Sequence, residues 1–311
     1  MNARRKLFFF GKGGVAPAPV GLLNTTEGAG AAFAISLRML NTDLIGQDAI
    51  EVKRVANSDF DRFPLAANGV PLSDIASFCG ASDGIVPWIL DQSGNGFHAQ
   101  QEAEAQAMKI YKDGAIVTEN GRPALLAEGN QGYLMPAIQI GNTPFIYVYN
   151  MFSTSSIIGS QALTSHYRFV TGERSWMLRL ADDTIDVWYS TGGSSNNRIR
   201  SNSIVEINSP TLAETQIKGM EAINIDRVKI FKNGKEVLVN DIADTSGPGN
   251  IAQATEPATI GAIRSSSASA ELALFFQGKF QETVGWAGQD KDLDGSRVII
   301  SNNVKSHYAI S

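Results

Sequence analysis

Apolar residues in the second half of the chain recur in short runs that either alternate with polar positions or continue without a break. Residues 144–152 form a continuous apolar run, which predicts a strand buried on both faces. Earlier, residues 49–55 alternate apolar and charged positions, as a half-exposed strand does. Short runs at regular spacing, separated by turn residues, predict an all-β sandwich rather than alternating strands and helices.

Asparagine, aspartate and glycine mark the turns of the predicted sandwich. Asn233-Gly234 lies between two alternating runs within residues 228–237, which predicts a tight type I′ hairpin. Asp182-Asp183 lies between apolar runs and predicts a second hairpin. Other turns are predicted at Asp113-Gly114, Asn120-Gly121 and Gly278.

Three stretches have the spacing of a helix. Within residues 31–40, apolar side chains recur at i, i+4 and i+7, which predicts one apolar stripe. A short helix through Phe78-Cys79 is predicted, capped by Ser73 or Asp74 and closed by Gly80. A C-terminal helix within residues 296–308 is predicted to pack on the sandwich.

A polar loop follows the apolar run 85–90, which includes Trp88. In Asp91-Gln92-Ser93-Gly94, the aspartate and serine side chains can bond neighbouring backbone groups, and the glycine permits a positive φ. A plain connector does not need this composition, so we expect a structural role for the loop. His98, next to it, is expected to close the loop by a hydrogen bond rather than to face a ligand.

The first 24 residues differ in composition from the rest. They are rich in glycine, alanine and proline and contain Phe8, Phe9 and Phe10. Residues 1–24 are either a disordered tail or an arm that becomes ordered against a neighbouring subunit, since three adjacent phenylalanines are poorly suited to water. The apolar run here is shorter than the 7 to 15 residues of a secretory signal, so we expect no export by that route. The predicted organisation is an N-terminal arm, 1–24, and one sandwich domain, 25–311.

Composition excludes several classes of protein. The 311-residue chain has a formal net charge of −5 and no basic cluster beyond its first residues, which argues against nucleic-acid binding. One cysteine, Cys79, and three histidines allow neither an intrachain disulfide nor a zinc-type spacing. No apolar run reaches 18 residues, so we expect no membrane span, and neither a metal nor a cofactor is expected.

The order of these motifs is similar to one known family. The Asp91-Gln92-Ser93-Gly94 loop, preceded by residues 51–54 and followed by 260–261 and 275–279, resembles the arabinofuranosidase B catalytic module. That module is a concanavalin A-like β-sandwich and also occurs in bacteriophage virion proteins. The resemblance covers most of residues 31–311 and implies a concanavalin A-like, laminin-G-like jelly roll with a few short helices.

Two departures from the family pattern bear on function. The resemblance implies a disulfide from Cys79 to a cysteine a few residues later, but Gly80 to Ile85 contain none, which fits assembly in a reducing cytoplasm. It also implies a catalytic pair whose nucleophile falls on Asp182 and whose acid/base position falls within 262–265, where no carboxylate stands. One carboxylate cannot both attack and donate a proton, so we expect no glycosidase activity.

Aromatic and polar residues after the second hairpin form the candidate carbohydrate surface. These residues are Trp188, Tyr189, Asn196, Asn197 and Arg198, and packing in the core or an interface is the alternative for the aromatic pair.

The leading hypothesis is a bacteriophage virion structural protein, associated with capsid or tail and assembled in the host cytoplasm. Its arm would dock on other virion proteins, its sandwich would be lectin-like and could bind a host glycan, and it would form a homo-oligomer. The alternative is an arabinofuranosidase-like glycoside hydrolase.

Overall fold

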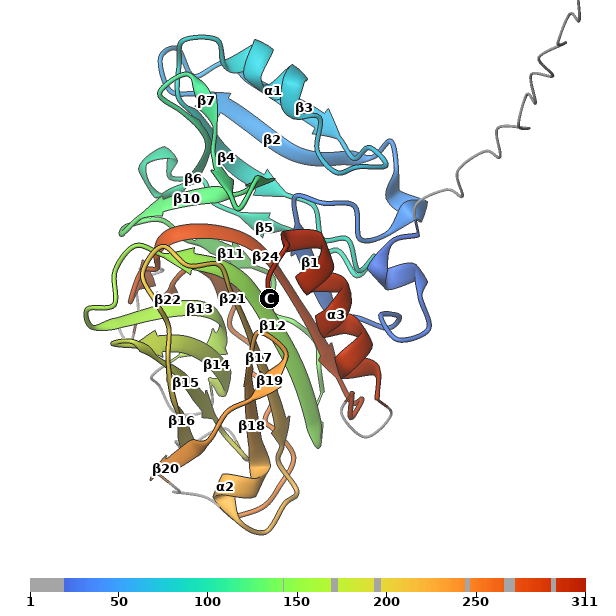
Figure 1. The fold of residues 1–311 in the computed structure, drawn as a ribbon, viewed down its shortest axis with the longest axis vertical. Coiled ribbons are helices and arrows are strands. Elements are labelled where there is room, and N and C mark those ends of the chain that lie inside the picture. Colours follow the sequence, from blue (N-terminus) through green and yellow to red (C-terminus); the bar gives the residue numbers. More distant parts are fainter. Residues whose placement is uncertain are drawn as a thin grey trace, which may run out of the picture.

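The computed structural model describes residues 20–141, 143–168, 173–192, 197–243, 247–265, 272–291 and 295–311. Within them the chain forms an all-β sandwich of antiparallel strands with a few short helices, as predicted (Figure 1). Phe8, Phe9 and Phe10 lie outside the described residues, as does Asn196. Residues 20–24 pack on the sandwich, because Leu22 in the 3-10 helix Leu22–Asn24 is only 2% exposed.

One sheet of the sandwich is built around two long central strands, β12 and β24. On the far side of β12 lie β17 and β18, while β1 and β10 share the free edge of β24. The bounds are β1 Phe33–Ser36, β10 Leu125–Glu128, β12 Phe145–Thr154, β17 Thr211–Lys218, β18 Val228–Lys232, β19 Lys235–Glu236 and β24 Gln277–Ala287.

The opposite sheet runs in the order β20-β16-β15-β14-β13-β21-β11-β5. Its bounds are β5 Ala99–Gln100, β11 Tyr133–Met135, β13 Ser160–Tyr167, β14 Arg174–Ala181, β15 Thr184–Tyr189, β16 Asn197–Ile204, β20 Val239–Ala243 and β21 Ala258–Ile260. Two short pairs, β8 Thr118–Glu119 with β9 Arg122–Pro123 and β22 Ile263–Arg264 with β23 Leu272–Ala273, lie apart from it.

The N-terminal strands join the two sheets, since β4 pairs with β5 of one and with β6, the neighbour of β10, in the other. They lie together in the upper part of Figure 1, with helix α1 beside them. Their bounds are β2 Asp48–Arg54, β3 Phe60–Pro64, β4 Gly84–Ile89, β6 Met108–Lys112, β7 Ala115–Ile116 and α1 Leu72–Cys79. The remaining helices are the 3-10 turns Thr42–Leu44 and Glu104–Gln106, α2 Asn224–Arg227 and α3 Ser296–Tyr308.

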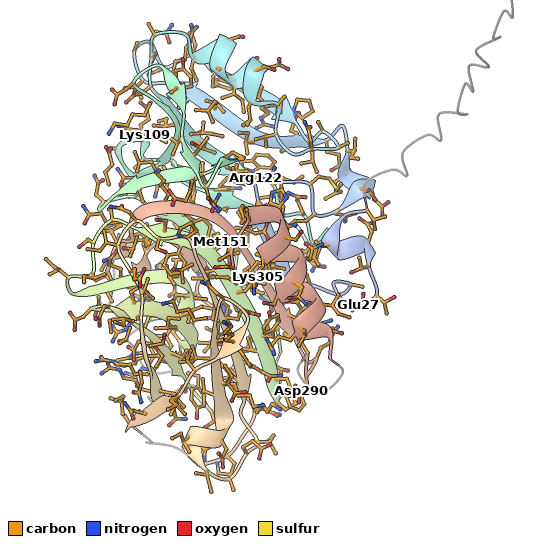
Figure 2. All side chains as sticks on the ribbon, in the orientation of Figure 1. Glu27, Lys109, Arg122, Met151, Asp290 and Lys305 are labelled. Atoms are coloured by element: carbon orange, nitrogen blue, oxygen red, sulfur yellow. The ribbon has the colours of Figure 1, made fainter. Side chains whose placement is uncertain are left out.

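Strand β12 is buried on both faces, which confirms the prediction made from its continuous apolar run. Ile146 and Val148 face the core between the sheets, and Tyr149 and Met151 face helix α3. All four are at most 2% exposed. Figure 2 labels Met151 on the sheet beside α3, and Lys305 on that helix. The predicted C-terminal helix therefore forms and covers the outer face of this sheet (Figure 1).

Two fully buried carboxylates lie on the sheet face beneath α3. Glu282 accepts two hydrogen bonds from the Arg38 guanidinium, at 2.7 and 2.8 Å, and further ones from Ser36 and Tyr149, both at 2.6 Å. Glu214 accepts a hydrogen bond of 2.7 Å from the Tyr147 hydroxyl. Helix α3 adds the Ser301 hydroxyl to Glu214 and the Tyr308 hydroxyl to Glu282, both at 3.1 Å. Because buried charges require partners, these contacts tie the helix to the sheet.

The predicted helix over residues 31–40 is wrong, because this segment contains strand β1. One edge of β1 pairs with β24. On the other edge, the Gln92 side chain accepts from the Leu40 amide at 2.7 Å and donates to the Ser36 and Arg38 carbonyls. These distant partners satisfy the backbone as an extended chain, and they outweigh a weak local helical pattern.

The tight turns form where the sequence predicts them. Asn233 and Gly234 have φ of 52° and 81°, and Asp113, Asn120 and Asp182 also have positive φ. The predicted turn at Gly278 is wrong. This residue lies inside β24 with φ of 144°, where a Cβ would meet the Ser153 carbonyl oxygen at 2.2 Å. Close backbone approach, rather than a turn, requires glycine there.

We expect Asn233→Val to lower the free energy of unfolding by about 1–3 kcal/mol, because a β-branched residue resists the positive φ of this turn. Asn233 Oδ1 also accepts from the Leu212 amide at 2.9 Å, and that bond would be lost. Asn233→Gly keeps the backbone conformation and loses only the side-chain bond, so it should cost less. Urea denaturation of both variants tests this, and equal costs would contradict the argument from φ.

Candidate functional site

The outer face of strands β14, β15 and β16 carries a cluster of charged and aromatic side chains. Cross-strand pairing places Arg179, Asp186 and Arg200 in one row, and Trp188 and Arg198 in the next. Side chains alternate between the two faces of a strand, so all five face outward. We call them the arginine cluster.

Asp186 is the centre of the arginine cluster. Its carboxylate is fully buried and accepts from Arg179 Nε at 2.7 Å and Arg198 Nε at 2.9 Å, and Arg200 Nε lies at 3.5 Å. Trp188 Nε1 donates to the same carboxylate at 2.8 Å. Three guanidinium groups thus share one carboxylate, which leaves an excess of two positive charges among these side chains.

The terminal nitrogens of the three arginines are unused by the part of the chain that the structure describes. Each guanidinium contacts Asp186 through Nε, and no Nη atom has a hydrogen-bond partner among the described residues. The three side chains are 8%, 19% and 30% exposed, in the order Arg179, Arg198 and Arg200. Nε hydrogen bonds therefore anchor Arg179 and Arg198, whereas Arg200 is only an ion-pair neighbour of Asp186 at 3.5 Å. The two Nη atoms of each arginine remain available as donors.

Trp188 is held in place by its neighbours. The guanidinium carbons of Arg179 and Arg198 lie 4.8 and 5.1 Å from its ring centroid, within the range of cation–π attraction. The Tyr167 ring meets it edge-on at 6.2 Å. The indole therefore supports the guanidinium groups as much as it offers a surface of its own.

The structure separates the predicted carbohydrate residues. Trp188 and Arg198 lie in the arginine cluster, whereas Tyr189 and Asn197 are fully buried, with Tyr189 in the core between the sheets. Sequence reasoning missed Arg179, Asp186 and Arg200. The alternation along the strands could have indicated two of them. Asp186 lies two positions from Trp188, and Arg200 lies two positions from Arg198, so each shares a strand face with a predicted residue.

Asp182 lies at the hairpin turn between β14 and β15. It has φ of 55°, and its Oδ1 accepts from the Gly159 amide at 3.1 Å. This contact ties the turn to the neighbouring loop, which is a structural use of the carboxylate. Of the positions to which the resemblance assigns the acid/base residue, Arg264 pairs with Glu256 at 3.1 Å.

The loop Asp91-Gln92-Ser93-Gly94 holds β1 against the sandwich. Asp91 accepts from the backbone amides of Ala34, Ser93 and Phe97 at 2.8 to 3.0 Å and from the Ser93 hydroxyl at 2.7 Å. Gly94 has φ of 86°. All of these contacts are within the protein. His98 Nδ1 accepts from the Asp91 amide at 3.0 Å and so closes the loop.

His166 on β13 is a fully buried titratable group. Its Nε2 lies 3.1 Å from the Glu256 carbonyl, which can only accept, so Nε2 carries the proton. Burial lowers the pKa of His166 to about 4. The imidazole is therefore neutral in the folded protein over the pH range in which an unfolded histidine becomes charged.

We expect His166 to make the fold less stable in acid. An unfolded histidine binds a proton near pH 6.5 and the folded one near pH 4, so stability falls as the pH drops between these values, by up to about 3 kcal/mol. His166→Gln should flatten the pH dependence of the melting temperature between pH 7 and 4.5. An unchanged pH dependence would contradict the burial argument.

No group of three histidine, cysteine, aspartate or glutamate residues within the part of the chain that the structure describes is placed to hold a metal ion. None of the helices in this part of the chain is long and apolar enough to cross a membrane.

Comparison with known proteins supports the fold. No family model and no curated protein matches the sequence. Among solved structures, the chain is similar to a GH54 α-L-arabinofuranosidase soaked with a cyclic sulfate inhibitor, with 16% identity and a TM-score of 0.57. An arabinofuranosidase complexed with arabinofuranosyl-α-1,2-xylobiose matches with 15% identity and the same TM-score. Each match covers 87% of this chain but only 63% of the other protein, and at this identity the likeness concerns the fold alone.

Proposed function

We propose that this protein is a non-catalytic glycan-binding sandwich of a bacteriophage virion, and that the arginine cluster binds an acidic sugar. The observation that carries the proposal is the sharing of one buried carboxylate by three arginines whose Nη atoms have no partner among the described residues. An excess of two positive charges on one small face favours an anion.

The geometry of a guanidinium suits the carboxylate or sulfate group of an acidic sugar. Its planar fork donates two parallel hydrogen bonds to such an oxyanion. Because Nε of Arg179 and of Arg198 is already hydrogen-bonded to Asp186, these two side chains lose little freedom on binding, which favours affinity. Trp188, which is only partly buried, adds apolar contact for a sugar ring. The overall net charge of −5 opposes extended contact with a nucleic-acid backbone.

We expect Arg200→Gln to weaken binding of an acidic oligosaccharide about tenfold or more, since a hydrogen bond to a charged group contributes about 1.5–3 kcal/mol. Arg179 and Arg198 still neutralise Asp186 in this variant, so the fold should persist. Calorimetric titration with trigalacturonate, sialyllactose and a heparin tetrasaccharide tests the proposal. Lys235→Gln, an equal change of charge on exposed β19, is the control. Failure of all three ligands to bind, or equal losses in both variants, would refute it.

The absence of glycosidase activity is also part of the proposal. It is supported by the use of Asp182 in a turn and by Ala262, Ile263, Arg264 and Ser265 at the position expected for a proton donor. Purified protein should release no sugar from arabinofuranosyl substrates. Turnover that Asp182→Asn abolishes would favour the hydrolase instead.

The virion setting rests on the sequence resemblance and on the apolar arm. Burying Phe8, Phe9 and Phe10 against a partner would contribute about 1.5–3 kcal/mol each. Leu22 packs on the sandwich although it lies within the predicted arm, so a deletion of residues 2–19 tests the arm without disturbing that contact. We expect this deletion to keep the melting temperature but to abolish joining of the oligomer or the particle. Normal incorporation of the truncated protein would contradict the arm hypothesis.

A further inference from the structure

Two adjoining hollows lie on the outer surface of the N-terminal strands, away from the arginine cluster. One has a volume of about 540 Å³ and is lined by Phe60, Trp88 and residues of β2 and β5. The other, of about 390 Å³, lies between β11 and the segment 100–106. Residues 100–102 line both, so the hollows form one trough. Each volume falls within the range of small-molecule sites, about 300–1,000 Å³.

The floor of the trough is a row of side chains that crosses five strands. Cross-strand pairing aligns Arg62 of β3, Glu51 of β2, Trp88 of β4, Gln100 of β5 and Leu134 of β11. Strands β2, β4 and β5 each pair on both edges. Their backbone groups are therefore occupied by the sheet, and a ligand on this floor meets side-chain chemistry only. That excludes recognition of a peptide by strand addition at this place.

Trp88 is the fixed aromatic of the floor. The Arg62 guanidinium carbon lies 5.6 Å from its ring centroid, and the His98 ring lies at 5.0 Å with a tilt of 47°. His98 is itself held by the Asp91 amide. The loop Asp91-Gln92-Ser93-Gly94 thus orients Trp88 through His98, so it also shapes the floor of the trough. Phe60, 63% exposed at the start of β3, adds a second aromatic surface.

The charges of the trough do not suit an anion. Lys53 is paired with Glu104, and Arg62 with Glu51 at 3.1 Å. Glu102 is exposed, so the lining has three carboxylates against two cations. This slight acidity is the opposite of the excess positive charge in the arginine cluster. An uncharged ligand fits the trough, and an acidic sugar does not.

We propose that the trough binds an uncharged oligosaccharide of two or more rings, laid across Trp88. The C–H face of one ring would pack on Trp88 and Phe60, which supply apolar area. Hydroxyl groups both donate and accept, and they match the Gln100 amide and the Glu51 and Glu102 carboxylates. The trough continues past Gln100 to Leu134, which provides space for the next ring. This site is separate from the arginine cluster and does not depend on what that cluster binds.

The test is a titration of the full chain with cellotetraose, xylotetraose, maltotetraose and chitotetraose, with trigalacturonate as the anionic comparison. Binding is read by tryptophan fluorescence and calorimetry. We expect at least one uncharged tetrasaccharide to bind, and Gln100→Ala and Phe60→Ala each to weaken that binding at least fivefold. Both residues lie at exposed positions, so the melting temperature should not change. Arg200→Gln should leave this binding unaltered.

Three results would overturn the proposal. These are no binding of any uncharged tetrasaccharide, binding that neither Gln100→Ala nor Phe60→Ala weakens, and binding that Arg200→Gln reduces as strongly as they do. Trp88→Phe adds a spectroscopic check, because it should remove most of the fluorescence change while retaining part of the affinity. Loss of acidic-sugar binding in Arg200→Gln alone concerns the arginine cluster, so the two proposals fail separately.

Discussion

Asp91→Ala is expected to lower the free energy of unfolding by at least about 3 kcal/mol. The Asp91 side chain accepts hydrogen bonds from three backbone amides and one hydroxyl, and the residue is only 1% exposed. Alanine would leave these donors buried without partners, at about 1–3 kcal/mol each. The loss should release β1 from the loop and weaken its pairing with β24. Urea denaturation followed by circular dichroism measures the effect.

Ser93→Ala is the matched control for this prediction. It removes a single donor to the Asp91 carboxylate and leaves the three amide bonds in place. We therefore expect a cost of about 1 kcal/mol. If Asp91→Ala were no more destabilising than Ser93→Ala, the loop would not be the clamp on β1 that its contacts indicate.

Glu282→Gln is expected to destabilise the protein far more than Glu214→Gln, although both carboxylates are fully buried beneath α3. Burial alone would raise the pKa of Glu282, but Arg38 and the hydroxyls of Ser36 and Tyr149 hold it below its ordinary value. Glutamine there removes the negative charge that Arg38 faces, and breaking a buried ion pair costs about 3–5 kcal/mol.

The pKa of Glu214 is shifted the opposite way, above its ordinary value. Burial raises it, and the hydroxyls of Tyr147 and Ser301 with the more distant Arg297 offset only part of that effect. The folded state therefore favours the neutral form more than the unfolded state does, so stability falls as the pH rises above the unfolded pKa of about 4.3. A neutral glutamine should cost little at pH 7 and should remove this dependence.

The pH dependence of unfolding distinguishes the two sites. The stability that Glu282 contributes is present above its unfolded pKa and is lost as the pH falls through its lower folded pKa. Melting temperatures of both variants between pH 3 and 8 provide the measurement. A larger loss for Glu214→Gln than for Glu282→Gln at pH 7 would contradict this assignment of the charges.

The two proposed binding surfaces share a physical feature. In each, an aromatic ring on a strand is fixed by a guanidinium, Trp188 by Arg179 and Arg198, and Trp88 by Arg62. They differ in charge balance, since Asp186 is shared by three arginines whereas Arg62 has Glu51 as a partner. One surface therefore favours an acidic ligand and the other an uncharged one.

Of the candidate site, the sequence could indicate Trp188 and Arg198 but not what surrounds them. Alternation along one strand shows which of its own residues share a face. It does not show which residues of the neighbouring strands lie beside them. Arg179 and Asp186 meet because β14 and β15 pair in one particular register. Tyr189 and Asn197 face away from the cluster because each lies one residue from a member that faces out.

The sequence by itself determined the β class and most turns of this protein. A turn such as Asn233-Gly234 needs positive φ at two adjacent residues, and few residue types adopt it. The identity of these two residues is therefore enough to predict the turn. Tertiary structure alone decided that residues 31–40 are extended and that three arginines converge on Asp186. Both outcomes depend on partners elsewhere in the chain: the Gln92 side chain that binds β1, and the neighbouring strands that bring charges together. Local periodicity does not encode a partner more than 50 residues away, and that partner determines which conformation satisfies the backbone.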